Sequence, residues 1–364
     1  MTRAKSKPGA GRLKKFILAV NFLFIIILLL TYITPYVTVQ KWGWLSLLTL
    51  AYPFTLFINF LFAVGWIFFR SWLSLLSIVA LLGGYGHHQK YIQLLPSGSS
   101  KKTCPESIRV LSYNMRGLSL IPVKENADFQ ARVDSLYNAL TDLKEYPDII
   151  CLQEASKGAI IAKRFGLDHS VHATKSSLWL LSRYPIIKNG QLQGAETGPS
   201  SMWADIKTPQ GIVRIYNMHL VSNRVTNTTE ELIQDMDLQN ENTWNNIKFI
   251  VSRYRRTTQK RAVEAKTMRD NMKGCKYPVL IAGDGNDTPL SHTYNVLTDG
   301  LKDSFREKGF GLSTTYASRL PLLRIDYLLS TEDIIFKDYS THHLSYSDHY
   351  PISAGICLQQ DDGS

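Results

Sequence analysis

The N-terminal part of the chain is almost free of charge, and this constrains the fold more than any other feature. Between Phe16 and Tyr85 the only charged residues are Lys41 and Arg70. A helix needs about 20 apolar residues to cross a bilayer. We therefore predict spans at about residues 16–36, 44–69 and 72–85. The third run has fourteen residues and is also short enough for a buried or interfacial helix.

Basic residues before the first span predict its orientation. The first fifteen residues contain six Lys or Arg and no acid, and such flanks stay in the cytoplasm. A signal peptide is the alternative, but its apolar core would be shorter, and Thr38–Lys41 offers no convincing cleavage site. Two spans would return the chain to the cytoplasm at Arg70. We favour three, which predicts a multi-pass membrane protein whose remaining chain lies on the extracytoplasmic side.

The net charge of +11 arises almost entirely from this region. Residues 1–107 hold eleven of the 41 Lys and Arg but only one of the 30 acids, so the rest of the chain is nearly neutral. The basic total is therefore weak support for nucleic-acid binding. The four cysteines, Cys104, Cys151, Cys275 and Cys357, form no C-x-x-C pair, which argues against a zinc or thioredoxin-like site. Whether Cys104 and Cys275 are free or paired stays open.

A linker at 87–107, with Gly, Pro and Ser, precedes a soluble domain at 108–358. Brief β-rich runs alternate there with helical patterns at Phe129–Leu143 and Thr257–Met272, which predicts a layered α/β or α+β domain. The polar stretch Asn223–Arg256 is predicted to be an inserted loop with some helix. The predicted strands are Ile108–Tyr113, Ile149–Leu152, Leu178–Leu181, Ile212–Met218, Val279–Ala282, Ile325–Leu329 and Ile352–Cys357.

Oxygen-bearing side chains adjoin three of these strands. Asn114 and Glu154 each follow an apolar run, and Asp348 precedes the last one. Magnesium takes oxygen ligands and often only one or two carboxylates. We therefore predict that Glu154 and Asp348, supported by the amide oxygen of Asn114, hold Mg²⁺, with Mn²⁺ as the alternative. For any one of them alone, a strand-end cap or solvated turn is the commoner role.

Asp284 and Asn286 lie in a glycine-flanked turn after a further apolar strand. Residues two apart on extended backbone face the same way, so the carboxylate and the amide can act on one water. The alternative is a plain Asx-turn, for which the same residue types are typical.

Two histidines and a buried acid complete the set. His219 ends the run Ile212–Met218, and His349 precedes the last strand. Asp326 lies inside an apolar strand, where a carboxylate is costly without a partner, and a histidine ring N–H is the natural one. A Lewis acid, an aligned water and donors for developing charge are what phosphate-ester hydrolysis needs.

From Ile108 to Leu358 the chain resembles the endonuclease/exonuclease/phosphatase superfamily. The resemblance implies a four-layer α/β sandwich with two facing, mainly antiparallel sheets. It rests on seven segments in the family's order: LSYNMRG at 111–117, PDIICLQE at 147–154, LLSRYPI at 180–186, YNMHL at 216–220, GDGNDTP at 283–289, IDYLL at 325–329 and SDHYPI at 347–352.

The resemblance also implies roles. Glu154 resembles the family's main metal-ligating glutamate, and Asn114 and Asp348 match its supporting metal or phosphate contacts. Asp284 resembles the residue that orients or deprotonates the attacking water, with Asn286 holding the phosphate beside it.

The two histidines match family positions as well. His349 is similar to the histidine that contacts the phosphoryl oxygen, oriented by Asp326. His219 matches a second histidine, which serves as general acid or phosphate clamp.

One position departs from the family pattern. A bulky aromatic is usual between the Asp and Asn of the turn, where this chain has Gly285. Deleting a buried aromatic typically costs about 3–5 kcal/mol unless neighbours fill the gap, and glycine loosens the turn. We expect weaker stability or activity than with an aromatic at 285.

These features predict a membrane-embedded, metal-dependent phosphodiesterase or phosphatase. Its substrate would be a lipid headgroup, a nucleic acid or a small phosphodiester. A nuclease is the alternative, supported by a basic helical strip in Lys248–Lys276, and an inactive anchored binding module is another. A transporter is disfavoured, because the spans carry no ionised group at depth.

Overall fold

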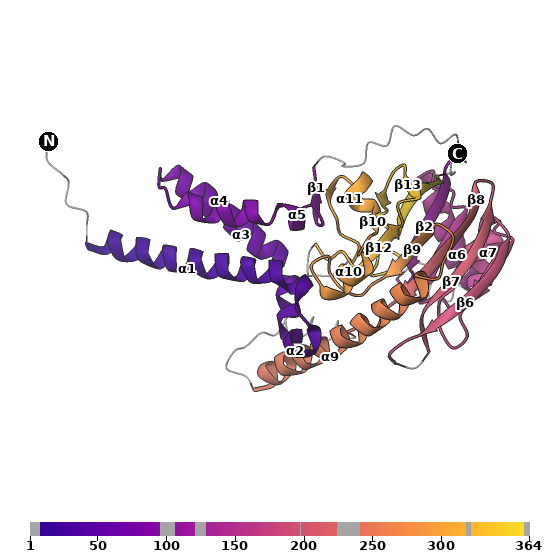
Figure 1. Ribbon diagram of the computed structural model, residues 1–364, viewed down its shortest axis with the longest axis horizontal. Coiled ribbons are helices and arrows are strands. Elements are labelled where there is room, and N and C mark those ends of the chain that lie inside the picture. The colour runs from indigo at the N-terminus through magenta and orange to yellow at the C-terminus, as the bar shows by residue number, and fades with distance from the viewer. Residues whose placement is uncertain are drawn as a thin grey trace.

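The computed structural model describes residues 8–94, 106–120, 129–196, 198–223, 241–317 and 322–359. The soluble domain has four layers (Figure 1). Helices α6 (Phe129–Asp142) and α7 (Gly158–Phe165) cover one sheet, and α9 (Glu241–Met272) and α10 (His292–Leu297) cover the other. The predicted sandwich of two facing, mainly antiparallel sheets is confirmed.

The first sheet carries a single parallel pair among the described strands, β2 with β3. Its strand order is β13 (Ile334–Phe336), β15 (Ile352–Leu358), β2 (Ile108–Asn114), β3 (Ile149–Gln153), β5 (Trp179–Ser182) and β4 (His169–His172), with β14 (Ser340–Thr341) also paired to β15.

The second sheet repeats this plan with the parallel pair β8 and β9. Its strand order is β10 (Lys302–Asp303), β12 (Asp326–Ser330), β9 (Val279–Asp284), β8 (Gly211–His219), β7 (Pro199–Thr208) and β6 (Ile186–Gln193). Two short helices complete the domain, η3 (Arg116–Leu118) and α11 (Ser304–Lys308).

The central strands are buried on both faces because each sheet has a neighbouring layer on either side. Successive side chains of a strand point to opposite faces. Val110 of β2 therefore packs against the second sheet, whereas Leu111 packs toward α6 and α7. This explains why β3 and β9 appear in the sequence as nearly continuous apolar runs rather than as alternating patterns.

The N-terminal region forms a helical bundle beside the domain (Figure 1). By length and composition, Gly11–Tyr36 and Val39–Phe68 can each cross a membrane, and Ser74–Gly83 is a shorter apolar helix. Its elements are α1 (Pro8–Ile33), η1 (Thr34–Tyr36), α2 (Val39–Trp42), η2 (Gly43–Leu47), α3 (Leu48–Phe68), α4 (Ser74–Gly83) and α5 (Tyr85–His88).

The bundle is attached to the domain through the start of the predicted linker. Strand β1 (Ile92–Gln93) pairs with β11 (Gly311–Leu312), and the Tyr91 side chain beside it is buried. Thr34 Oγ1 donates to the Leu290 carbonyl at 2.8 Å. These contacts hold the bundle against the segment that follows β9.

The prediction of an inserted loop with some helix at Asn223–Arg256 is confirmed for the helix, because α9 begins at Glu241. Residues 224–240 lie outside the described part of the chain. Polar residues dominate the first half of α9, so its helical period is weak in the sequence. The β6–β7 hairpin was not among the predicted strands.

Candidate functional site

Strand pairing brings the predicted residues to one edge of the sandwich. In the parallel pair β2–β3, Asn114 is opposite Gln153, so Glu154 follows at the same edge. In the parallel pair β8–β9, His219 is opposite Asp284. Because the carboxyl ends of parallel strands meet, each pair delivers two functional side chains together.

The antiparallel neighbours bring two further residues to this edge. Strand β12 starts at Asp326, opposite Asp284 at the end of β9. Strand β15 pairs with β2, and His349 lies in the loop just before β15. Six strands therefore converge on a single region.

Asp284 is the centre of this region and is almost fully buried. Its Oδ2 accepts from the side-chain amides of Asn114 and Asn286, each at 3.0 Å. Its Oδ1 accepts from the Asn286 backbone N–H at 2.8 Å, which is an Asx-turn. The Asx-turn and the predicted pairing of the Asp284 carboxylate with the Asn286 amide are therefore the same structure, and the two interpretations of this segment do not exclude each other.

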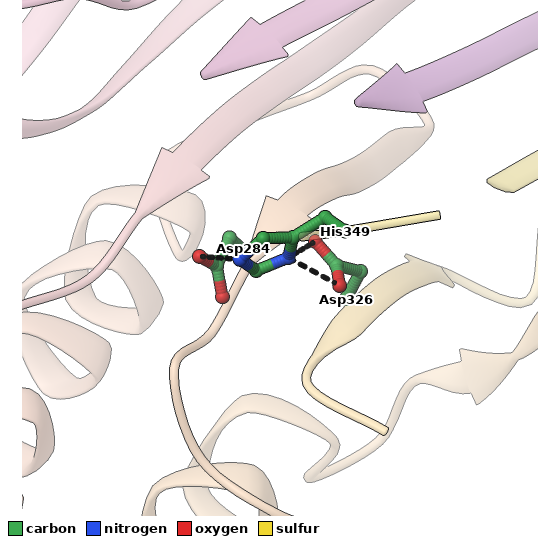
Figure 2. A group of neighbouring side chains, drawn as sticks. All are labelled: Asp284, Asp326 and His349. Carbon is green, nitrogen blue, oxygen red and sulfur yellow. Dashed lines mark hydrogen bonds and ion pairs between the residues drawn. The ribbon is translucent and has the colours of Figure 1, made fainter. Parts of the chain in front are cut away.

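His349 connects Asp284 to Asp326 (Figure 2). Its Nδ1 lies 3.0 Å from Asp326 Oδ2, and its Nε2 lies 3.7 Å from Asp284 Oδ2. Burial alone would lower the pKa of His349, but the carboxylates of Asp326 and Asp284 outweigh it and raise that pKa to about 10. Burial raises the pKa of Asp326, and His349 opposes this rise. The two carboxylates therefore favour the imidazolium form of His349, whose Nδ1 donates to Asp326 while its Nε2 stays outside hydrogen-bonding distance of Asp284.

Glu154 and His219 form the open side of the site. Glu154 Oε1 lies 3.4 Å from Asn114 Nδ2 and 3.6 Å from His219 Nε2, and its side chain is 42% exposed. Glu154 has a φ of 50°, a left-handed conformation uncommon for a non-glycine residue. His219 Nε2 is buried and has no hydrogen-bond partner in the described part of the chain. Its distance of 3.7 Å from Asp284 Oδ2 is too long for a hydrogen bond.

Asp348 has a different environment from the other two predicted metal ligands. Its Oδ2 lies 3.0 Å from Arg116 Nη1, and Ser347 Oγ donates to its Oδ1 at 3.2 Å. Ser347 Oγ also lies 2.9 Å from the Asn114 carbonyl, so Asp348 stays near the end of β2. Asn114 presents its amide nitrogen, rather than its oxygen, to Glu154 and Asp284.

Three possible ligand atoms, from Asp284, Asp326 and His349, lie within 4.8 Å of one another. All three residues are buried, and Asp326 is already bonded to His349. The more exposed carboxylate of Glu154 fits a hard, partly hydrated cation better, since magnesium keeps several waters.

Two buried amides that the sequence reasoning did not select connect the sheets directly below this site. Gln153 Nε2 donates to Asn217 Oδ1 at 2.6 Å, and Asn217 Nδ2 donates to the carbonyls of Leu152 and Trp179. Gln153 directly precedes the predicted site residue Glu154, and Asn217 lies two residues before the predicted site residue His219. A polar residue inside an apolar strand was the signal that could have identified them.

A second missed group supports the turn after β9. The buried Arg261 of α9 pairs with Asp287 at 3.1 Å, and Thr293 Oγ1 donates to the same carboxylate at 2.9 Å. Arg261 also donates to the Val221 carbonyl just beyond β8. Helix α9 thus holds both strand ends that carry His219 and Asp284.

The expected gap beside Gly285 is absent. A Cβ at this position would lie 3.1 Å from Cε2 of the Tyr327 ring. Tyr327 is buried, and its hydroxyl donates to the Asp287 carbonyl at 2.6 Å. The expectation of an unfilled gap was therefore wrong, because a tyrosine from β12 occupies the space.

Comparison with known proteins agrees with this geometry. A family model described as the Endonuclease/Exonuclease/phosphatase family matches residues 111–349, and one described as a domain of unknown function, DUF8431, matches residues 14–91. No curated protein matches the chain.

Solved structures share the fold. An endonuclease/exonuclease/phosphatase from Bacteroides vulgatus has 17% identity and a TM-score of 0.50 over 71% of this chain and 100% of its own. A family protein from Bacteroides thetaiotaomicron has 16% identity and a TM-score of 0.49 over the same shares. A mannosyl-6-phosphatase from the latter organism has 16% identity and a TM-score of 0.45 over 69% and 100%.

The family model covers most of the chain and all of the strand ends described above. With its hydrolase fold, the chain belongs to the endonuclease/exonuclease/phosphatase family, whose members use divalent metals to act on phosphate esters.

Proposed function

We propose that this chain is a membrane-anchored phosphoric-ester hydrolase that requires a divalent cation, Mg²⁺ or Mn²⁺. The observation that carries the proposal is the single network at the sheet edge that joins Asn114, Glu154, His219, Asp284 and His349. A structural role alone does not explain two imidazoles whose Nε2 atoms lie near carboxylates yet outside hydrogen-bonding distance.

Glu154 would hold the cation, with Asp348 at the same end of β2 as a second carboxylate and with the Asn114 amide N–H orienting Glu154. The partly exposed carboxylate of Glu154 and the buried imidazole nitrogen of His219 without a partner suit a site completed by a ligand. When bound, the cation supplies a Lewis acid that polarises a phosphoryl oxygen.

Asp284 would orient the attacking water and accept its proton. The two asparagine amides fix the plane of its carboxylate, so little reorganisation is needed at the moment of attack. Asn286 is itself held by the Leu220 carbonyl at 2.9 Å, which links the turn to the end of β8.

The two histidines would donate to the phosphoryl group. His349 is cationic through Asp326 and Asp284, and its Nε2 faces the site. His219 Nε2 is free to donate to a second oxygen or to the leaving group. Both would stabilise charge that grows in the transition state.

The arrangement of the helices supports three crossings and an extracytoplasmic domain. The N-terminal end of α1 lies far from the domain in Figure 1, and η1 lies beside it. If the basic flank of α1 is cytoplasmic, the domain lies across the membrane from it.

Two further observations suit a membrane-anchored domain outside the cytoplasm. Large exposed apolar side chains such as Phe16, Phe57 and Phe60 suit lipid contact better than a soluble core. Cys357 is disulfide-bonded, which is typical of an oxidising compartment, and Cys151 and Cys275 are free. Cys104 lies outside the described residues.

Hydrolysis of bis-p-nitrophenyl phosphate by the full chain in detergent tests the activity. We expect turnover that EDTA abolishes and that Mg²⁺ or Mn²⁺ restores. Glu154→Gln and Asp284→Asn should each lower kcat by about 100-fold or more. Asp270→Asn is the control, because Asp270 is exposed on α9 and pairs only with lysines at the helix surface. Turnover that survives EDTA and both variants would contradict the proposal, and bound metal without turnover would identify an inactive module.

A phosphodiester at the membrane surface is the substrate that we infer, because the domain is joined directly to the bundle. Nucleic acid is the alternative, favoured by the basic residues of α9. Parallel assays with phospholipid vesicles, single-stranded and duplex DNA, RNA and sugar phosphates would separate the two.

A further inference from the structure

A groove of about 640 Å³ lies between η2 and the first half of α9. None of the proposed catalytic residues lines it, so it is separate from the site described above. In Figure 1, α2 lies beside this half of α9, at the domain end of the bundle. The apolar lining consists of Trp44, Trp244, Ile247 and Val251.

The face of α9 that lines the groove follows helical spacing. Trp244, Ile247, Val251 and Arg255 are three or four residues apart and so lie on one side of the helix. Gly43 allows η2 to approach this side, because a Cβ there would meet Arg255 Cγ at 3.0 Å. Gln259, one turn further, donates toward the Val39 carbonyl at 3.3 Å. The groove is therefore built by a close contact between the bundle and α9.

The position of the groove suits a membrane–water interface. Helix η2 lies near the start of the second candidate span, Val39–Phe68, soon after the first, Gly11–Tyr36, ends. Trp42 and Trp44 have ring centroids 6.4 Å apart, and both are about half exposed. Tryptophan is enriched at the headgroup level of membranes, where one end of its ring is apolar and the other wet.

The rim of the groove is basic. Lys248, Arg255 and Arg256 line it, and no acidic residue lines it in the part of the chain that the structure describes. Within the described residues none of these three has an ion-pair partner. By contrast, Lys260 and Arg261 further along the same helix pair with Glu196 and Asp287.

We propose that this groove binds one anionic phospholipid of the surrounding bilayer. The phosphate of this lipid would be held by Lys248, Arg255 and Arg256. One of its acyl chains would lie against Trp44 and Trp244. Bases at a membrane surface attract anionic lipids, and the apolar part of the lining suits a hydrocarbon chain. The inference rests on the membrane insertion proposed above, but not on the hydrolytic activity.

Lipid bound in this groove would also stabilise the turn after β9, because α9 contacts both the groove and this turn. Arg255 and Arg261 are six residues apart, which is roughly 9 Å along a helix. Arg261 holds Asp287 in the turn after β9. A bound lipid that clamps α9 against η2 would therefore stabilise the domain as well as the bundle.

Native mass spectrometry of the full chain, purified in detergent and mixed with dioleoyl phosphatidylglycerol or dioleoyl phosphatidylcholine, tests the proposal. We expect one phosphatidylglycerol to be retained at least tenfold more strongly than phosphatidylcholine, and the melting temperature to rise with phosphatidylglycerol alone. Lys248→Gln with Arg256→Gln should lose both effects. Lys266→Gln with Lys273→Gln removes the same charge from exposed positions around Asp270 and should behave as wild type.

The proposal is overturned by equal retention of phosphatidylglycerol in the groove variant and the control, or by equal retention of both lipids in the wild type. Lys248→Arg with Arg256→Lys keeps the charge and should restore binding, which separates loss of the site from misfolding. Carbonate extraction of membranes checks insertion independently. Release of the chain would contradict both insertion and the lipid site, while turnover of the soluble substrate would still report on the hydrolase.

Discussion

Gly285 and Tyr327 together occupy a space that the resemblance assigned to one aromatic side chain. Because a Cβ at 285 would already lie 3.1 Å from the Tyr327 ring, Gly285→Phe overfills the core. Overpacking of this kind typically costs about 1–3 kcal/mol. We expect Gly285→Phe to lower the melting temperature and kcat, since the turn also carries Asp284.

The double variant Gly285→Phe with Tyr327→Ala provides the control. Removing the tyrosine ring makes room for phenylalanine, so the double variant should melt higher than Tyr327→Ala alone. It should still fall short of wild type, because the bond from the Tyr327 hydroxyl to the Asp287 carbonyl is lost. A single Gly285→Phe variant as stable as wild type would refute this account.

His342 predicts a pH dependence of stability away from the catalytic edge. Burial, with Arg109 and His343 nearby, lowers the pKa of His342 from 6.5 to about 4. The folded state therefore binds fewer protons than the unfolded chain between these values. The contribution of neutral His342 to the free energy of unfolding is therefore complete above pH 6.5 and is lost as the pH falls toward 4. This contribution amounts to about 1–3 kcal/mol.

The Oε1 atom of Glu145 lies 3.9 Å from His342 Nε2. When ionised, Glu145 therefore offsets part of the stability lost on protonation of His342. Comparison of the melting temperature at pH 8 and pH 5 for wild type and His342→Gln measures the effect. Glutamine can keep a bond to Ser353, the present partner of the ring. The drop on acidification should be smaller in the variant, and an equal drop would exclude His342 as its source.

At the scale of elements, α9 is the support of the catalytic turn. Arg261 and Asp287 are both fully buried and paired. Replacing one partner leaves the other charge uncompensated, which typically costs about 3–5 kcal/mol. We expect Arg261→Met to destabilise the domain by this amount and to reduce kcat more than KM.

Lys260→Met is a matched control on the same helix, because its pair with Glu196 is partly exposed. Surface pairs contribute about 0–1 kcal/mol. Chemical unfolding and kinetics of the two variants would test the difference. Similar losses of stability and of kcat in both variants would show that the buried pair of Arg261 with Asp287 has no larger role than the surface pair of Lys260 with Glu196.

The same element shows how far sequence reasoning could reach. The strand ends at Asn114, Glu154, His219 and Asp284 were predictable, because each follows a mainly apolar run. The start of α9 was not predicted, since the polar stretch Asn223–Arg256 suggested a loop with some helix, while contacts with the N-terminal bundle stabilise a helix from Glu241. Strand β6 was missed for a related reason: much of it is exposed, with few apolar residues to form a pattern.

Long-range partners were equally inaccessible. The bonds between Gln153 and Asn217, and between Arg261 and Asp287, join residues on different elements. A sequence can indicate that a buried polar group needs a partner, but it does not indicate which one. Asp326 and His349 were an exception, because the resemblance paired them.

At the scale of the whole molecule, hydrogen bonds between side chains connect the helices of the N-terminal bundle. Asn21 Nδ2 donates to Ser77 Oγ at 2.8 Å, and Trp66 Nε1 donates to Asn21 Oδ1 at 3.0 Å, so one residue connects α1, α3 and α4. Such bonds in membranes contribute about 0.6–2 kcal/mol each. The bundle is thus a folded unit that can serve as a platform for the domain.

Removal of this platform should weaken the domain, which is the final prediction. Leu290, just beyond the catalytic turn, packs with Tyr32, Tyr52 and Tyr91 in one buried cluster. The buried Arg324 donates to the Lys90 carbonyl at 3.1 Å. A chain that starts at residue 106 loses these contacts and the β1–β11 pairing, and exposes Leu290 to water. Burying a leucine contributes about 1.5–3 kcal/mol.

We expect the truncated domain to melt several degrees lower than the domain transition of the full chain in detergent, and to turn over bis-p-nitrophenyl phosphate more slowly. Thr34→Val in the full chain isolates one contact, the bond to the Leu290 carbonyl, and should show a smaller shift in the same direction. Equal melting temperatures for the truncated and full chains would mean that the bundle only anchors the domain and does not stabilise its catalytic turn.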